Sequence, residues 1–351
     1  MLNRKNLVIL VGALAVLVIV AVIQKTSHQK RTSRSSSTVL IDGEFAGADL
    51  SQVTIDHGQE LGVVTLNRGP EGWLVASAWN SRASDQRIDS LLRTVSNLRG
   101  EYRSDNQDVL ADYGFTESVI TISGLGQDGA QAFSIQVGGK PEGGQGCFVK
   151  RPDSNEVFYT GKNLLSELGL WSGPDRPESR HFLELQAYTS DRQSVNVLAL
   201  QGEEIVTMAK EFTMVEPAEG DTLVTEPYAD RTQWEWRLVG QGSESLGMAA
   251  KTKADGVLGA VVNIRAQDVV DPGAGLATYG LEGEGSRSVT VYLEDKDIPE
   301  IMVFGNSREA EGEAPAGTYM MVPSQGTTIW VVGDYAVNNI FKTLEELKPE
   351  E

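Results

Sequence analysis

The sequence predicts an α+β protein in which one N-terminal transmembrane helix precedes two tandem copies of one β-rich unit. Three observations predict this architecture: an apolar run near the N-terminus, a gapless internal repeat, and the same order of strand and helix patterns around each copy of the repeat. The chain of 351 residues is long enough for two domains, and 40% apolar residues with six Trp can build their cores.

Residues 7–23 are all apolar or Gly, and as a helix they span roughly 26 Å, enough to cross a bilayer. Neither a small-residue cleavage site nor a lipobox-like Cys follows the run, so we expect an uncleaved single-pass anchor. Residues 1–6 then form a short tail, and residues 24–38 form a basic, Ser-rich tether.

The side of the membrane is set by opposing signals. Two basic residues precede the span and four follow it, and this count alone favours a cytoplasmic body. The short basic tail directly before an apolar core is instead typical of an export signal. Together with the family resemblance given below, it leads us to expect an extracytoplasmic body on the bacterial cytoplasmic (inner) membrane.

The formal charge of −19 is unevenly distributed along the chain. Residues 1–34 hold six basic residues and no acid, which leaves 24 basic against 49 acidic residues and a body charge of about −25. Such a field repels phosphate backbones, so nucleic acid is not expected as a partner. Cys147 stands alone and is expected to be buried in a strand.

The internal repeat aligns Ile88–Gly100 with Ala254–Ala266, and Asp, Leu, Val, Asn and Arg coincide. Apolar residues from Ile88 to Leu98 recur at helical spacing, Ser84 can cap the helix, and Gly100 supplies its stop. In both copies a polar loop follows the expected helix and ends in a Tyr-Gly pair, Tyr113-Gly114 and Tyr279-Gly280.

Alternating apolar runs around this helix predict antiparallel strands, and a short helix closes each copy. The second copy departs from the first at Glu211–Thr232, an acidic, Pro-containing insertion that we expect to be a loop. The lobes are predicted at residues 39–172 and 180–351. The expected strands are 52–55, 61–66, 73–77, 118–122, 132–137, 147–151 and 156–160, then 195–200, 205–210, 236–239, 288–293, 300–304, 318–322 and 327–332; the closing helices are 163–170 and 335–347.

These residues resemble the bacterial family described as domain of unknown function 4340. The likeness covers roughly Val53–Leu170 and is weaker over the second copy. The resemblance implies a single N-terminal span, an exported β-rich body, and association with transporter components related to the gliding-motility ABC system. It is informative about fold and weak about activity. The positions that carry it are Trp73, Ile88–Leu98, Tyr113-Gly114, Val137-Gly138 and Val157–Tyr159, then Trp236, Ala254–Ala266, Tyr279-Gly280 and Gly305–Val332.

No motif carries recognisable chemistry, so we assign no catalytic, cofactor-binding or metal-binding residue and leave the ligand-binding residues unknown. His28, His57 and His181 are expected to be surface residues. Glu101, Asp105, Asp108 and Asp112 are expected in a solvated acidic loop, and Gly138–Gly146 is expected to join two strands rather than bind phosphate. Trp234 and Trp236 are expected on opposite sides of one strand, which would leave at least one near the surface.

Three functions remain open after the sequence is considered. The first is a non-enzymatic, membrane-anchored accessory or scaffold protein of the bacterial cell envelope, a partner of an ABC-type transport complex. The second is a binding module for an envelope polymer or a cationic ligand. The third is a hydrolase whose site is assembled from scattered acids. The partner's identity and the oligomeric state stay open.

Overall fold

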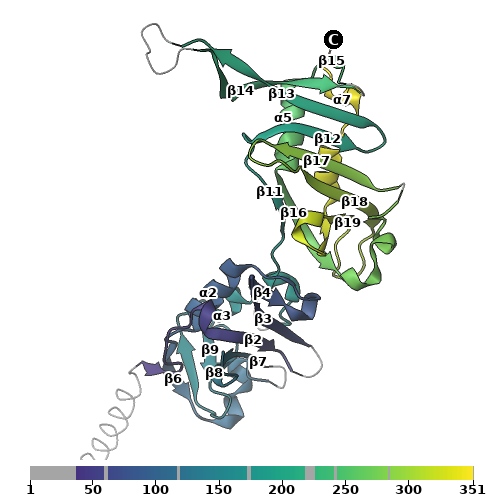
Figure 1. Cartoon of the computed structure of the whole chain (residues 1–351). Helices are drawn as coiled ribbons and strands as arrows, with labels where there is room; N and C mark the ends of the chain where they lie inside the picture. Colours follow the sequence, from purple (N-terminus) through teal and green to yellow (C-terminus); the bar gives the residue numbers. More distant parts are fainter. Residues whose placement is uncertain are drawn as a thin grey trace, which may run out of the picture. The chain divides into compact units, whose positions relative to one another are not determined.

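The computed structural model describes residues 37–58, 62–116, 119–171, 175–217, 226–240, 243–283 and 285–350 (Figure 1). The tail at 1–6, the predicted span at 7–23, and residues 24–36 of the tether lie outside the described residues, as does His28. Among the helices that are described, none has the length and apolar character needed to cross a membrane.

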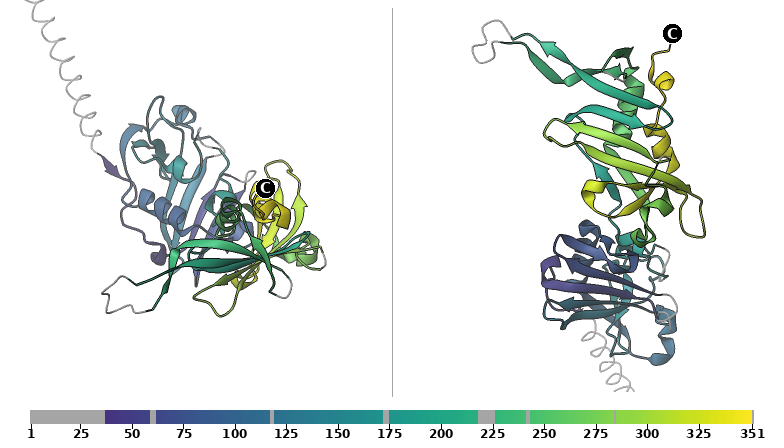
Figure 2. Two further views of the ribbon diagram at one scale, coloured as in Figure 1. Left: turned by 90° about the horizontal axis from the view of Figure 1, so that it is seen from above. Right: turned by 45° about the vertical axis from the view of Figure 1, so that its right-hand side comes forward.

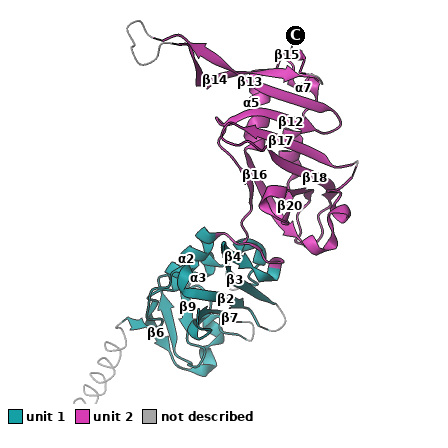
Figure 3. Ribbon diagram, viewed as in Figure 1, with its two compact units in different colours: residues 1–77, 85–182 teal, residues 78–84, 183–351 magenta. Residues whose placement is uncertain are grey.

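The chain divides into two compact units (Figure 3). Unit 1 comprises residues 1–77 and 85–182, and unit 2 comprises residues 78–84 and 183–351. Helix α4 (Ser179–Phe182), expected at the start of the second lobe, belongs to unit 1. Strand β1 begins at Thr38, the last residue of the expected tether.

The first sheet contains ten described strands in the order β1-β6-β10-β9-β8-β7-β2-β3-β4-β5. The strand pairs from β1 through to β4 in this order are all antiparallel. The elements are β1 (Thr38–Val39), η1 (Gly47–Asp49), β2 (Leu50–Asp56), β3 (Val63–Gly69), β4 (Gly72–Val75), η2 (Ala76–Ala78), β5 (Ser81–Arg82), α2 (Asp85–Val95), β6 (Arg99–Ser104), η3 (Gln107–Val109), η4 (Ala111–Tyr113), β7 (Ile120–Gly126), β8 (Gln131–Val137), β9 (Cys147–Lys150), β10 (Val157–Thr160), α3 (Leu164–Glu167) and α4.

The second sheet repeats this order with ten described strands, β11-β16-β20-β19-β18-β17-β12-β13-β14-β15. Its elements are β11 (Gln186–Thr189), β12 (Val195–Gln201), β13 (Ile205–Val215), β14 (Tyr228–Val239), β15 (Ser245–Met248), α5 (Lys251–Val261), β16 (Asn263–Val270), η5 (Pro272–Ala274), η6 (Leu276–Tyr279), β17 (Arg287–Leu293), β18 (Glu300–Arg308), β19 (Gly317–Met321), η7 (Pro323–Gln325), β20 (Ile329–Val332), α6 (Asp334–Ile340) and α7 (Leu344–Leu347).

Each strand of the first sheet therefore has a counterpart ten strands later, at the same place in the second sheet. Helices α2 and α5 occupy the same place in this order, between the fifth and sixth strands of their units. The predicted fold class, α+β with two tandem β-rich units, is confirmed for the described part of the chain.

One face of each sheet is buried under helices. Strands β2, β7 and β8 alternate between buried and more exposed residues, as expected for one buried face. Helix α2 buries the stripe Ile88, Leu91, Leu92 and Val95, and α5 buries the equivalent Ala254, Val257, Leu258 and Val261. A second, smaller cluster forms around Tyr279, Leu281, Met321 and Ile329.

The repeated Tyr-Gly pairs are turns that pack against a glycine, Gly138 directly after β8 in unit 1 and Gly305 inside β18 in unit 2. Gly114 and Gly280 have φ of +81° and +66°, a conformation that favours Gly. A Cβ at Gly138 would lie 2.3 Å from the Tyr113 carbonyl oxygen, and one at Gly305 would lie 2.0 Å from the Tyr279 carbonyl oxygen. The motif is thus explained by close backbone packing in both units.

The predicted helix is right in type and start but too long. Helix α2 begins directly after Ser84, as predicted, and ends at Val95 instead of continuing to Leu98. Asn97, with φ of +48°, turns the chain, and Gly100 lies inside strand β6, where its lack of a Cβ leaves room for Phe158. The polar loops expected after the two helices therefore contain the strands β6 and β16.

The expectation that the insertion in the second copy is a loop is wrong for most of its described residues. Strand β13 continues to Val215 and β14 starts at Tyr228, so the hairpin is lengthened (Figure 2). The alternation of polar and apolar residues over Glu211–Met214 suits a strand. The helix expected at 335–347 is split into α6 and α7 around Phe341, and the one expected at 163–170 is reduced to α3.

Candidate functional site

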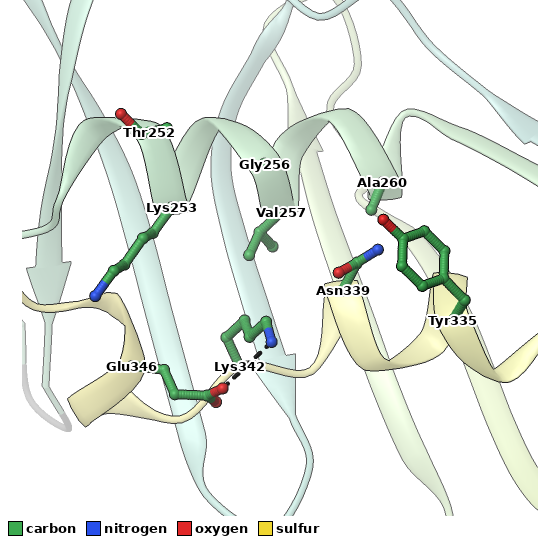
Figure 4. Close-up of a pocket in the computed structure, with 9 residues that line it drawn as sticks. All are labelled: Thr252, Lys253, Gly256, Val257, Ala260, Tyr335, Asn339, Lys342 and Glu346. Carbon is green, nitrogen blue, oxygen red and sulfur yellow. Dashed lines mark hydrogen bonds and ion pairs between the residues drawn. The ribbon is translucent and has the colours of Figure 1, made fainter.

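A groove of unit 2 lies between α5 and the segment formed by α6 and α7 (Figure 4). Its volume is about 630 Å³. Figure 4 shows the α5 residues facing those of α6 and α7 across the groove. The lining residues are Thr252, Lys253, Gly256, Val257 and Ala260 from α5, and Tyr335, Asn339, Lys342 and Glu346 from the segment opposite.

Two small residues of α5, Gly256 and Ala260, line the groove. A Cβ added at Gly256, or at Gly259 outside the lining, would meet no heavy atom within 4 Å. Each Gly in a helix interior costs about 1 kcal/mol relative to Ala, and neither position needs Gly for packing within the described chain. The two glycines therefore lower helix stability without an internal packing reason.

The equivalent helix face of unit 1 is bridged by side chains. In the gapless alignment Ser90, Arg93 and Thr94 occupy the positions of Gly256, Gly259 and Ala260. The Thr94 hydroxyl donates to Glu167 Oε1 of α3 at 3.3 Å. The Lys162 Nζ donates to the carbonyl oxygens of Thr94 and Ser96 at 2.9 and 2.7 Å, which satisfies the end of α2.

Arg87, the counterpart of Lys253, completes this bridging in unit 1. Its guanidinium contacts His181 Nδ1 of α4 at 2.8 Å. The groove of unit 2 thus lies on a helix layer that carries smaller residues than its counterpart in unit 1.

The groove walls combine an aromatic ring with paired charges. Tyr335 is 83% exposed at one end. Lys342 and Glu346 form an ion pair at 3.2 Å, and Lys253 contacts Glu350 at 3.4 Å. Two ammonium groups in a strongly acidic body make this one of its less acidic surfaces.

A polar cluster beside the groove helix repeats in part between the units. The indole nitrogens of Trp236 and Trp234 donate to Asp255 Oδ1 of α5 at 3.0 and 3.2 Å. Trp73 and Asp89 are the counterparts of Trp236 and Asp255 in unit 1, but Trp73 Nε1 has no hydrogen-bond partner among the described residues. The cluster is thus complete only in unit 2.

Burial alone would raise the pKa of Asp255, but the indole hydrogen bonds and the charges of Lys251 and Arg192 outweigh it. The pKa of Asp255 is therefore held below its usual value. Arg192 and Lys251 lie 3.4 and 3.7 Å from the carboxylate. The cluster fixes β14 to α5 and supports the groove helix from behind.

Lys210 lies under this cluster in an aromatic cage. Its Nζ lies 4.1 Å from the ring centre of Trp234 and 5.7 Å from that of Trp236. It donates to the carbonyl oxygens of Arg192 and Gln193 at 2.6 and 3.4 Å. Burial, with help from the Arg192 charge, lowers the pKa of Lys210 to about 8.

The expectation that the histidines lie at the surface is wrong for His57, whereas His181 is half-buried. His57 is buried, and burial lowers its pKa. His181 lies in unit 1, and its Nε2 contacts the Glu167 carbonyl oxygen at 3.0 Å. Burial and the Arg87 charge lower the pKa of His181. Neither histidine is among the residues that line the groove of unit 2.

Other predicted positions lie where the sequence placed them. Cys147 is buried in β9, as predicted, and burial raises the pKa of its thiol to about 11. The acids Glu101, Asp105, Asp108 and Asp112 are exposed, although Glu101 lies in β6. Residues 138–146 connect β8 to β9, as expected.

The expectation for Trp234 and Trp236 is wrong. Residues two apart on a strand point to the same face, and both indoles reach Asp255. Trp236 is buried, and Trp234 is half-buried. Both residues do lie in one strand, β14, but side chains on a strand alternate with a period of two residues.

The described residues contain no group of three or more His, Cys, Asp or Glu placed to hold a metal ion. The groove was not predicted from the sequence. The one pattern that could have indicated it is the pair of glycines inside helix α5, Gly256 and Gly259. The Lys210 cage was not predicted either, because it depends on strand pairing between β13 and β14.

A family profile described as domain of unknown function (DUF4340) matches residues 73–282, more than half of the chain. The matched segment begins in β4 and ends after η6, so it includes parts of both units. Comparisons with curated proteins and with solved structures give no match. The chain belongs to the DUF4340 family, a domain of unknown function.

Proposed function

We propose that this protein is a non-enzymatic, membrane-anchored accessory or scaffold protein of the bacterial cell envelope that binds a membrane partner through the groove of unit 2. The partner is expected to be a component of an ABC-type transport complex. The anchor would be residues 7–23, and the body would lie outside the cytoplasm.

The observation that carries this proposal is the open glycine face of α5. Gly256 lines the groove with no side chain packed against it, whereas unit 1 fills the same helix face with bridging side chains. Glycine permits close approach of another backbone. The helix stability given up at this position is explained if a partner segment lies across α5.

A matched pair of substitutions tests the proposal. Gly256 lines the groove and Gly259 does not, yet both have free space at Cβ. The full chain carrying a C-terminal affinity tag is purified from bacterial membranes in mild detergent, as wild type, Gly256→Leu and Gly259→Leu. Proteins recovered with each are quantified by mass spectrometry.

We expect wild type and Gly259→Leu to recover the same membrane protein, and Gly256→Leu to recover at least about tenfold less. A tenfold loss corresponds to about 1.4 kcal/mol, a modest cost for a blocked groove. Equal recovery by all three proteins, or recovery of no membrane protein by wild type, would count against the proposal.

A second candidate function is a binding module for an envelope polymer. Exposed Tyr335 beside Asn339 offers an aromatic face next to an amide, an arrangement suited to a sugar ring. Cationic ligands fit the groove less well because Lys253 and Lys342 line it. A thermal-shift panel with soluble cell-wall fragments distinguishes this function, since a shift lost in Tyr335→Ala would favour it over a protein partner.

A further inference from the structure

The lengthened hairpin of unit 2 includes a two-stranded portion, residues 211–215 of β13 and 228–235 of β14, here called the arm. Figure 2 shows the hairpin extending past the neighbouring strands of its own sheet. Strand β12 pairs with β13 only as far as Ala209, and β15 pairs with β14 only from Arg237 onward. Among the described residues, no strand pairs with either outer edge of the arm.

The arm is not required by the fold. In unit 1 the equivalent hairpin closes with Gly69 paired to Gly72, directly after Arg68 pairs with Trp73. In unit 2 the equivalent pair, Lys210 and Trp236, is followed by the arm. A two-stranded ribbon has marginal stability in water, and unpaired strand edges are templates for another strand.

The two edges of the arm differ. The β14 edge is irregular, because the residues that pair with Phe212 and Thr213 are Trp234 and Asp230, which leaves three β14 residues unpaired between them. The Lys251 ammonium also donates a hydrogen bond to the Trp234 carbonyl oxygen on this edge. The β13 edge is continuous from Glu211 to Val215. An added strand therefore has a regular edge only along β13, where alternate residues direct N–H and C=O groups outward.

The charges on the arm indicate which kind of added strand it could bind. Glu211 and Glu235 are directly opposite each other, an unfavourable like-charged pair, and Arg237 contacts Glu211 at 3.0 Å. Arg231, the cation of the described arm, pairs with Glu294. Glu235, the other carboxylate of the like-charged pair, is thus left without an ion-pair partner among the described residues. Two copies of this acidic arm would repel each other.

Apolar side chains supply the remaining contact area. Met214 is 60% exposed and Tyr228 is 49% exposed. They lie on opposite faces of the arm, because Met214 pairs with Ala229 and Tyr228 pairs with Val215. An incoming strand can therefore bury apolar side chains on either face.

We propose that the β13 edge of the arm binds an extended segment of a partner protein, carrying Lys or Arg at alternate positions, as an added third strand. Backbone hydrogen bonds to residues 211–215 give affinity, and selectivity comes from cations of the added strand beside Glu211, with Glu235 one strand further away on β14. The inference deepens the proposed function and rests on it for the existence of a protein partner, but it uses elements other than the groove.

The test uses three nine-residue dye-labelled peptides and the full chain in detergent. The first peptide alternates Lys with Thr and Val, the second replaces Lys by Glu, and the third is the Lys peptide N-methylated at alternate residues. Binding is followed by fluorescence anisotropy at low salt. The proteins are wild type, the double variant Glu211→Gln with Glu235→Gln, a short-hairpin variant with residues 213–233 replaced by Asn-Gly, and Gly256→Leu. Circular dichroism melts establish that each is folded.

We expect the Lys peptide to bind wild type and Gly256→Leu equally, and the double variant about fivefold more weakly, the effect of two exposed charge pairs. The Glu peptide, the N-methylated peptide and the short-hairpin variant should show no saturable binding. Equal binding of the Lys and N-methylated peptides would overturn strand addition, as would wild-type binding by the short-hairpin variant. Peptide binding lost only in Gly256→Leu would assign the peptide to the groove and overturn the arm proposal. If the double variant binds the Lys peptide as tightly as wild type while the co-purification assay still recovers a membrane protein, that result would overturn the arm proposal and leave the groove proposal standing.

Discussion

At the scale of single residues, glycines allow the Tyr-Gly turn of each unit to pack closely against the sheet at equivalent positions. Gly138 and Gly305 face the carbonyl oxygens of Tyr113 and Tyr279 at distances that leave no room for a Cβ. The sequence alone could show that these positions recur but not why, because the contact joins segments separated along the chain. Gly256 is the opposite case, a Gly with free space around it.

Alanine at either packed glycine should destabilise its unit. Gly138→Ala and Gly305→Ala each force a Cβ against a backbone carbonyl, and we expect each to lower the free energy of unfolding by about 1–3 kcal/mol. Urea titration monitored by circular dichroism measures the change. Gly285→Ala is the matched control, since its Cβ would meet no atom within 4 Å; equal effects at all three positions would contradict the close-packing explanation.

Lys210 should make stability depend on pH. Its folded pKa of about 8 lies below its ordinary value of 10.5, so the unfolded chain holds the proton more tightly. Below pH 8 the charged, desolvated ammonium opposes folding; between about pH 8 and 10.5 the folded state loses the proton first, and the contribution of Lys210 to stability rises by roughly 1–3 kcal/mol.

The measurement is urea unfolding of wild type and Lys210→Met at several pH values from 7 to 10.5. The buried Cys147 thiol has a raised pKa and acts in the opposite direction, but it is present in both proteins and cancels in the difference. A difference between the two proteins that stays constant over this pH range would show that burial does not lower the Lys210 pKa.

At the scale of elements, hydrophobic periodicity was a good guide to strands and a poor guide to helix ends. Both meanders, β7 to β10 and β17 to β20, were predictable because β7, β8 and β17 alternate with one buried face and β20 is a short, wholly buried apolar run. Strands β6 and β16 were not, because their place beside β10 and β20 is a long-range pairing. Leu98 continues the helical stripe of α2 by coincidence, since it is buried after the helix has ended.

The groove helix should become more stable when its glycines are replaced. Gly256→Ala and Gly259→Ala each add helix propensity without a clash, and we expect each to raise the free energy of unfolding of unit 2 by about 0.5–1 kcal/mol. Thermal melts of the full chain measure this gain. A loss of stability in either variant would mean that α5 has an internal packing reason for its glycines, which would remove the main support for the groove.

At the scale of the whole molecule, the duplicated topology is the feature that sequence analysis anticipated best. Thirteen aligned residues around each helix indicated it, and the identical strand order of the two sheets confirms the repeat within the described residues. What distinguishes the units could not be foreseen: unit 1 closes its helix layer with Lys162, Glu167 and His181, while unit 2 leaves a groove and extends a hairpin.

The proposed anchoring predicts the side of the membrane on which both units lie. Fusion of alkaline phosphatase or of a fluorescent protein active only in the cytoplasm to Glu351 should give phosphatase activity and no fluorescence in a bacterial host. Deletion of residues 7–23 should abolish the phosphatase signal, because export would then lack its apolar segment. Fluorescence with inactive phosphatase would place the body in the cytoplasm and contradict an envelope partner.

Photo-crosslinking from the groove tests the central claim most directly. A photoreactive phenylalanine derivative replaces Tyr335, which is exposed at the end of the groove, in the full chain within bacterial membranes. We predict one specific crosslinked membrane protein after irradiation, retained with Gly259→Leu and reduced at least about tenfold with Gly256→Leu. No crosslinked protein, or a crosslink unaffected by Gly256→Leu, would contradict a partner-binding groove on unit 2.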